Sequence, residues 1–362
     1  MKRREFLKTA GASLAATAVA APAIAQSTPE VKWRLTASWP KSLDTLYGCP
    51  EYMAKRIAEA TDNKFQIQVF AAGEIVPGLQ VLDAVQNGTV EMGHTATYYY
   101  FGKDPTFTFG TALPFGLNTR QQNAWQFQGG GMELINDFLK TYNCWGMPTG
   151  NTTCQMGGWF RKEIKSVADM NGLKMRIGGF AGRIQAKLGL VPQQIAGGDI
   201  YPALEKGTLD AAEWVGPYDD EKLGFQKVAK YYYYPGWWEG GAQPHLLVNL
   251  NKWNELPKAY RALVQAAAHD AGVWMTAKYD VQNPQSLKRL VGSGAVLRPF
   301  PQEVMEASYK AANEIYAEIA ATNANFKKLL DSLTAFRGDS YQWMQVAELG
   351  FDSFMMRMRA RT

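Results

Sequence analysis

Residues 82–93 read LDAVQNGTVEMG, and the pattern returns at residues 201–213 as YPALEKGTLDAAE. Each copy starts with apolar residues at helical spacing, passes through Asn-Gly-Thr or Lys-Gly-Thr, and ends in a short run typical of a strand. Glycine is the residue that most often follows a helix end, so both copies indicate a helix–turn–strand unit. Two copies this far apart predict two similar α/β lobes and not a short-period repeat.

The segments around both copies extend the α/β pattern. VKWRLTASWP at residues 31–40 and KFQIQVF at residues 64–70 alternate like strands, and a helical pattern lies between them. GLKMRIGG at residues 172–179 has the composition of a strand, and AGRIQAKLGL at residues 181–190 that of a helix. Alternating strands and helices predict a mostly parallel sheet with helices on its faces.

The last third of the chain is predicted to be helical from residue 256 onward. Its final segment, SYQWMQVAELGFDSFMMRMRA at residues 340–360, is amphipathic and rich in Met and Phe. A helix with so many large apolar side chains needs a surface to cover. That surface is either the helix's own lobe or a second copy of the protein, and the sequence leaves both open.

The first residues, MKRREFLKTAGASLAATAVAAPAIAQ, have the features of an export signal. A basic head precedes an apolar stretch too short to span a bilayer, and Ala-Ile-Ala precedes Gln26 as a cleavage site. Arg3-Arg4 followed by Glu-Phe-Leu-Lys resembles a twin-arginine signal, although an ordinary secretory signal is the alternative. We therefore predict a signal peptide at residues 1–25 and a mature chain in the periplasm.

Size and charge agree with an ordinary globular protein. Removing 25 residues from the 362 leaves about 337, enough for two domains. The formal charge of +5 falls to about +2 once the four basic residues and one acid of the signal are removed, so no nucleic-acid partner is indicated. Of the three cysteines, Cys144 and Cys154 could pair across a predicted hairpin, or all three could be buried free thiols.

Sequence motifs of common enzyme classes are missing. The chain has no Gly-x-Ser-x-Gly elbow and no phosphate-binding loop. Its three histidines, His94, His245 and His269, have no Cys or His at metal-ligand spacing. This pattern counts against a hydrolase or a transition-metal enzyme, although an exported enzyme remains an alternative because folding can bring distant residues together.

Charged residues beside aromatic or apolar ones mark the candidate site. Arg176 lies within an apolar strand pattern, where its guanidinium could either grip a carboxylate ligand or pair with an acid of the protein. Glu213 adjoins Trp214, and Glu239 follows two tryptophans. Three tyrosines at residues 98–100 follow a predicted strand, and ligands bind at strand ends in open α/β sheets.

Long stretches of the sequence resemble one family. Residues 69–105, 150–164 and 173–241, together with the helical C-terminal third, are similar to the periplasmic solute-binding proteins of tripartite ATP-independent periplasmic (TRAP) transporters. The branch that binds 2-oxo acids such as pyruvate is the most similar. The resemblance implies a transport receptor and not an enzyme. It also implies a type II-like, two-lobed α/β periplasmic binding protein fold, with hinge strands and long C-terminal helices, that closes on its ligand.

The resemblance also implies a domain plan. Lobe I is expected at residues 26–152 and lobe II at residues 153–242, with a return to lobe I through a long helix at residues 243–295. A helical C-terminal region is expected at residues 296–362, where relatives exchange the terminal helix in a homodimer. TRAP membrane permease subunits are the implied partners.

The family's site residues can be carried over to matching positions. The resemblance implies that Arg176 grips the solute carboxylate and that a cation is held by Gln155, Glu213, the backbone carbonyl of Trp214, and Glu239. Gln155, Trp214, Tyr99 and Tyr100 are the further expected solute contacts. Oxygen ligands suit Na⁺ or Ca²⁺ better than Zn²⁺, and the choice between the two stays open.

Charge explains why a cation is needed beside two acids. Two like charges about 4 Å apart repel by roughly 4 kcal/mol at an effective dielectric of 20, so Glu213 and Glu239 would repel a bound anion. A bridging cation removes that repulsion. The expected solute is a 2-oxo monocarboxylate, with lactate or another 2-hydroxy acid as the alternative. A carbohydrate stacked on Trp214, Trp237 and Trp238 is the remaining option.

Overall fold

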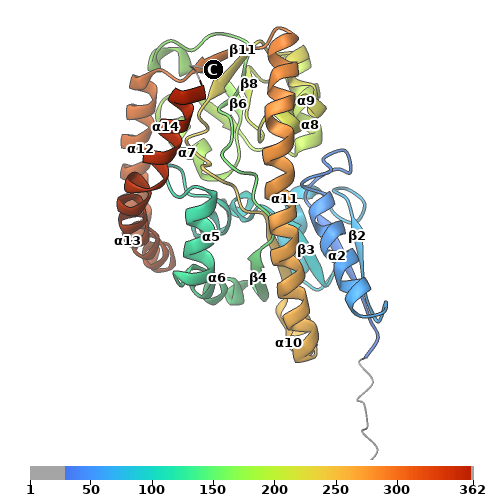
Figure 1. Cartoon of the computed structure of the whole chain (residues 1–362). Helices are drawn as coiled ribbons and strands as arrows, with labels where there is room; N and C mark the ends of the chain where they lie inside the picture. Colours follow the sequence, from blue (N-terminus) through green and yellow to red (C-terminus); the bar gives the residue numbers. More distant parts are fainter. Residues whose placement is uncertain (1–28, 360–362) are drawn as a thin grey trace, which may run out of the picture.

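The strands assemble into two separate sheets (Figure 1). The computed structural model describes residues 29–359, so the predicted signal peptide at residues 1–25 lies outside the described residues. Within that range the first sheet has the order β2-β1-β3-β10-β4 and the second β11-β9-β5-β8-β6-β7. The strands of the first sheet are β1 (Val31–Ala37), β2 (Phe65–Phe70), β3 (Met92–Thr95), β4 (Cys144–Pro148) and β10 (His245–Asn249). Those of the second are β5 (Gly158–Phe160), β6 (Lys174–Arg176), β7 (Val191–Gln193), β8 (Ala211–Ala212), β9 (Tyr231–Tyr234) and β11 (Val296–Pro299).

Within residues 29–359, the strands of each sheet run mostly parallel, as predicted, apart from one reversed strand. β1 pairs in parallel with β2 and β3, but β10 runs antiparallel to β3 and β4. In the second sheet β5 runs antiparallel to both β8 and β9. Among the described strands, β10 and β5 are therefore the reversed strands of the first and second sheet.

Helices cover the sheets where the apolar periodicity predicted them. On α2, Met53 and Ile57 are buried, as their spacing predicted. The helices beside the first sheet are α2 (Gly48–Ala60), α3 (Val81–Gln86), α4 (Thr108–Thr111), α5 (Thr119–Gln128) and α6 (Gly131–Leu139). Those of the second are α7 (Gly179–Lys187), α8 (Gly197–Glu205) and α9 (Pro217–Leu223). The C-terminal third contains α10 (Leu250–Glu255), α11 (Lys258–Gly292), α12 (Gln302–Ala320), α13 (Ala324–Val346) and α14 (Glu348–Arg359).

The chain passes between the sheets after β4, after β9, and again between α11 and β11. Helix α11 runs along both halves of the molecule (Figure 1). Its first half packs on α2, where Trp274 stacks on Tyr52 at 5.2 Å, and its second half packs on α9. The region predicted as helical from residue 296 begins instead with β11, which pairs in parallel with β9.

The predicted hairpin between Cys144 and Cys154 is wrong. Cys144 lies in β4, which pairs with β10, and the three described cysteines are free. Cys49 and Cys144 are buried, but Cys154 is exposed, so the expectation of three buried thiols holds for two. Across residues 29–359, no helix is both long and apolar enough to cross a membrane.

A buried carboxyl on α9 makes stability depend on pH. Asp220 accepts hydrogen bonds from Trp159 (3.0 Å) and Tyr232 (2.7 Å), yet burial raises its pKa to about 7. The folded state therefore holds a proton that the unfolded state releases near pH 4. The stabilisation is complete below about pH 4 and is lost as the pH rises to about 7, by up to about 1.4 kcal/mol per pH unit. In chemical denaturation at several pH values, the free energy of unfolding should fall less steeply with rising pH for Asp220→Asn than for the wild type. Parallel declines would contradict this.

Candidate functional site

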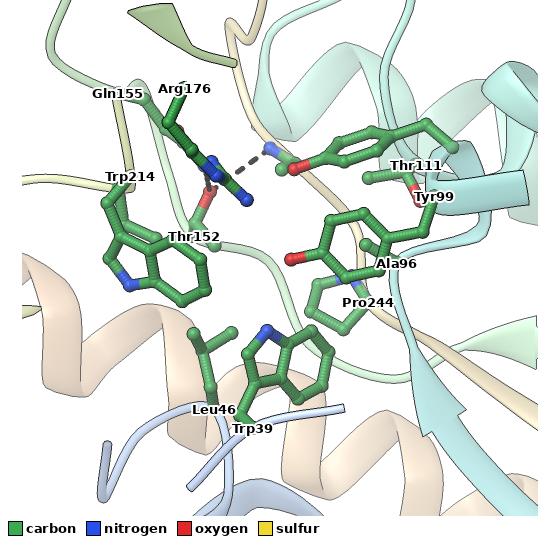
Figure 2. A pocket seen from close by; sticks show the side chains of 13 residues that line it. Trp39, Leu46, Ala96, Tyr99, Thr111, Thr152, Gln155, Arg176, Trp214 and Pro244 are labelled. Atoms are coloured by element: carbon green, nitrogen blue, oxygen red, sulfur yellow. Dashed lines mark hydrogen bonds between the residues drawn. The ribbon is translucent and has the colours of Figure 1, made fainter. Parts of the chain in front are cut away.

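A cavity lies between the two sheets and is lined from both of them (Figure 2). It is small, with about 20 Å³ of room for the centre of a water-sized molecule. The lining residues are Trp39, Leu46, Ala96, Tyr98, Tyr99, Thr111, Thr152, Gln155, Arg176, Trp214, Val215, Ala242 and Pro244. A site of this size fits a molecule of only a few heavy atoms.

Arg176 is the only lining cation within the described residues, and it is 1% exposed. It stands at the end of β6, and the parallel pairing of β6 with β8 brings it opposite Ala212, next to Glu213. Its Nη1 donates to the Glu213 carboxylate (2.5 Å) and to the Glu213 carbonyl (3.0 Å), and its Nε to the carbonyl of Ile195 (3.3 Å). The Nη2 group has no partner. Arg176 thus both pairs with a protein acid and keeps one donor free.

Glu213 is fully buried beside that arginine. Its Oε1 also accepts from the backbone N–H of Gly178 (2.9 Å), whereas Oε2 has no partner. Burial raises the pKa of Glu213, and the Arg176 charge and the Gly178 hydrogen bond oppose that rise. A carboxylate with one oxygen satisfied and the other free is prepared for one further positive contact.

Two more oxygens without partners belong to Gln155 and Glu239, each 3% exposed. The Gln155 side chain donates from Nε2 to the Thr152 hydroxyl (2.8 Å), which leaves Oε1 free, and its backbone N–H donates to the Glu239 carbonyl (3.1 Å). Burial raises the pKa of Glu239 well above its usual value, and the neighbouring Glu213 raises it further. Buried polar atoms seldom lack partners, so these oxygens indicate a missing positive partner.

The donor set fits the expected cation. It consists of an amide oxygen, two carboxylates and the expected Trp214 carbonyl, all hard ligands of the kind that Na⁺ and Ca²⁺ take. Over residues 29–359, no group of three or more His, Cys, Asp or Glu side chains is arranged to hold a metal. Glu213 and Glu239 do not line the cavity, but each contacts a residue that does.

The opposite end of the cavity is apolar. In Figure 2, Leu46, Trp39 and Pro244 lie across the cavity from the guanidinium of Arg176 and from Gln155. The Arg176 guanidinium also lies 4.8 Å from the centre of the Trp214 ring, which forms a further wall. The cavity is therefore suited to a small molecule with a charged head and an apolar remainder. No sequence pattern singled out Leu46, Trp39 or Thr152 as site residues.

The three tyrosines of residues 98–100 have different surroundings. They lie in a single 3₁₀ turn after β3, and Tyr98 and Tyr99 line the cavity. Tyr100 does not reach it, because its hydroxyl bonds to Thr95 (2.9 Å) and accepts from the N–H of Leu82 (3.0 Å). Of the two tyrosines expected to contact solute, Tyr99 therefore lines the cavity and Tyr100 does not, whereas Tyr98 lines it without having been predicted. Trp237 and Trp238 are buried outside the lining residues.

Glycines allow the second lobe to approach these tyrosines closely. A Cβ atom at Gly178 or Gly179 would lie 2.9 or 2.8 Å from the ring of Tyr98. At such distances the side chain or the loop would have to move. Only Ile177 separates the Gly178–Gly179 pair from Arg176, so the pair lets the arginine and the tyrosines meet across the cavity.

Comparison with known proteins agrees with this fold. Residues 36–323 match the family of bacterial extracellular solute-binding proteins, family 7, called DctP. A monocarboxylate 2-oxoacid-binding periplasmic protein of Nostoc is 50% identical over 98% of this chain and 99% of its own length.

Two solved structures extend the comparison. A TRAP transporter solute-binding protein of Bordetella bronchiseptica, with copurified calcium and picolinate in its active site, is 51% identical with a TM-score of 0.91, covering 92% of this chain and 99% of that one. One from Pseudoalteromonas atlantica, with bound sodium and pyruvate, is 38% identical with a TM-score of 0.87, covering 90% and 99%. The predicted fold and the expectation of a binding protein rather than an enzyme are confirmed. The chain belongs to the DctP family of TRAP transporter solute-binding proteins.

Proposed function

We propose that this protein is a periplasmic receptor for a small 2-oxo monocarboxylate of the size of pyruvate, which it binds together with Na⁺ or Ca²⁺. The observation that carries the proposal is the set of buried atoms without partners around one cavity. One guanidinium donor, Arg176 Nη2, and three oxygens of Gln155, Glu213 and Glu239 are all unsatisfied. A carboxylate and a cation together would satisfy all four.

The geometry suggests how the chain's residues act on the solute. Arg176 is fixed by Ile195 and Glu213, so its free Nη2 is already aimed when a carboxylate arrives. Gln155 is oriented by Thr152, which keeps its oxygen toward the cation. The cation would supply positive charge that lets an anion sit near two acids. Leu46 and Trp39 would enclose the short apolar end of the solute.

Known relatives support this choice of solute and ion. The Nostoc relative is a 2-oxoacid-binding protein, and solved relatives contain pyruvate with sodium or picolinate with calcium. In each of these acids a second donor atom lies next to the carboxylate and can share a cation with it. Lactate has the same arrangement through its hydroxyl, so a 2-hydroxy acid is the second candidate.

Native mass spectrometry of the purified mature protein tests this proposal. The intact complex should carry the added mass of one 2-oxo acid and one Na⁺ or Ca²⁺ per subunit after incubation with pyruvate. Competition with lactate should show weaker displacement than competition with 2-oxobutyrate. Binding of a neutral sugar, or of pyruvate with no ion at any concentration, would contradict the proposal.

We also propose that two copies associate through α14 and deliver solute to TRAP membrane subunits. None of the residues of α14 is buried, and the side chains of Phe351 and Phe354 are more than half exposed, so packing on its own lobe does not cover them. The Bordetella relative is described as a dimer. Phe351→Glu with Phe354→Glu should give a monomer by light scattering after size-exclusion chromatography, with the wild type a dimer. A wild-type monomer, or a variant that stays dimeric, would contradict this.

A further inference from the structure

The loop that joins β1 to α2, residues 38–47, contributes to the cavity on one side and to the second lobe on the other. Trp39 and Leu46 line the cavity. Asp44 and Thr45, the two residues before Leu46, contact α9 in the second lobe. Turn hydrogen bonds from Leu43 to Pro40 (3.1 Å) and from Tyr47 to Leu43 (2.8 Å) hold the loop together, so its two sides move as a unit.

Asp44 accepts hydrogen bonds from residues on the other side of the boundary between the lobes. Its carboxylate accepts from the Tyr218 hydroxyl of α9 (3.1 Å), from Lys222 at the end of α9, and from Lys278 of α11 (2.8 Å). Lys278 also donates to the Asp44 carbonyl (2.9 Å). These groups are partly exposed, so each pair contributes less than a buried one. Together they hold the loop to two separate elements.

Thr45 makes the buried half of the same contact. Its hydroxyl donates to Asp219 of α9 (3.1 Å), and Asp219 also accepts from Tyr279 of α11 (2.6 Å). Thr45, Asp219 and Tyr279 are each fully buried. Hydrogen bonds that join buried groups are costly to break, because opening the lobes leaves a carboxyl group without its donor until water enters.

Helix α9 follows the candidate ligand segment directly. Only Val215 and Gly216 separate Trp214 from the first residue of α9, Pro217, and the N–H of Val215 donates to Asp220 (3.3 Å). A loop that grips α9 therefore also fixes the position of Glu213 and Trp214 relative to Leu46. The polar and apolar walls of the cavity are joined through this contact.

We propose that Asp44 and Thr45 are positioning residues that clasp the two lobes shut and slow the release of solute. The clasp consists of Asp44 and Thr45 on the loop with Tyr218, Asp219 and Lys222 on α9. Neither Asp44 nor Thr45 lines the cavity, so the clasp acts by holding the closed arrangement in which Leu46 covers the site. The dissociation rates that test this clasp are measured with pyruvate, so that measurement rests on the proposed function.

Thr45→Val and Asp44→Ala test the clasp. Thr45→Val keeps the shape of the side chain and removes only the hydroxyl. Stopped-flow tryptophan fluorescence, which Trp39 and Trp214 make sensitive to the cavity, should report faster dissociation of pyruvate by about 3- to 10-fold for each variant, from the usual net value of one hydrogen bond. The association rate should change little, because the open form is unaffected. Thr45→Ser should restore the wild-type rate.

A matched control distinguishes the effect of losing the clasp from the effect of losing an ordinary surface ion pair. Asp83 pairs with Lys103 at 2.8 Å with exposure similar to that of Asp44, but both residues belong to the first lobe. Asp83→Ala should leave the dissociation rate unchanged. Dissociation rates within twofold of wild type for both Thr45→Val and Asp44→Ala would overturn the clasp.

Small-angle X-ray scattering of the protein without solute gives a second, independent readout. The Asp44→Ala/Thr45→Val double variant should have a larger radius of gyration than the wild type, because more molecules are open. Equal radii would overturn the clasp. Because this measurement needs no solute, it decides the clasp even if the wild type binds no 2-oxo acid, a result that would refute the proposed function instead.

Discussion

Arg176→Ala is expected to abolish binding of pyruvate, weakening it on the order of 1,000-fold. The substitution removes the only cation that lines the cavity within residues 29–359, so a carboxylate entering this buried site would lose its water without gaining a partner. Loss of one partner of a buried charge pair costs roughly 2–5 kcal/mol, and about 4 kcal/mol corresponds to three decades in Kd. Tryptophan fluorescence titration or calorimetry measures the change.

Two further variants distinguish a loss of binding from a loss of folding. Arg176→Ala leaves Glu213 buried without its partner, so Arg176→Met with Glu213→Gln removes both charges together and should fold while still failing to bind. Arg298→Ala is the matched control, because Arg298 pairs with Glu163 on the surface of the same lobe, and it should bind like the wild type. Pyruvate affinity within about 10-fold of the wild-type value in a folded Arg176→Ala protein would refute the site.

Glu239→Gln is expected to weaken solute binding about 100-fold by removing charge from the cation site. The amide keeps the size of the side chain, but a neutral oxygen replaces a carboxylate that is 3% exposed and has one free oxygen. Weakening one ligand of a buried ion costs a few kcal/mol, which corresponds to this factor. Calorimetric titrations of pyruvate at several Na⁺ and Ca²⁺ concentrations should show that the variant needs a far higher ion concentration than the wild type to reach half of its maximal affinity for pyruvate.

The acid Glu163 provides the control for that variant. It is partly exposed in the same lobe and pairs with Arg298, so Glu163→Gln changes charge by the same amount without touching the cavity. Its ion dependence should match that of the wild type. If Glu239→Gln also retains the wild-type ion dependence, Glu239 is not a cation ligand.

Local patterns in the sequence were sufficient to predict most elements, but not how they pair. The alternation in residues 31–40 and the spacing of Met53 and Ile57 reflect burial of one face, which is a local property. Whether a strand pairs in parallel depends on where the chain returns, so β5 and β10 were not distinguished from parallel strands. The short strand β11 was missed because four residues between two long helices carry little periodic signal.

The candidate site depends on contacts that the sequence pattern does not contain. Arg176 and Glu213 are 37 positions apart and meet because β6 and β8 are neighbours in a particular register. That register follows from packing of whole lobes, so only the family resemblance linked the two residues in advance. The position of Tyr100 away from the cavity was not predictable for a similar reason, since the three tyrosines share one turn and only its rotation decides which side chains face the cavity.

Calorimetric titration of pyruvate into the wild-type protein, with and without a cation, tests the central claim most directly. The claim is that an arginine and an oxygen-bound cation jointly neutralise a small organic acid between the lobes. We predict tight, one-to-one binding with Na⁺ or Ca²⁺ present, and a loss of affinity of at least about 100-fold in a choline buffer with chelator. Equal affinity in the two buffers would contradict the account.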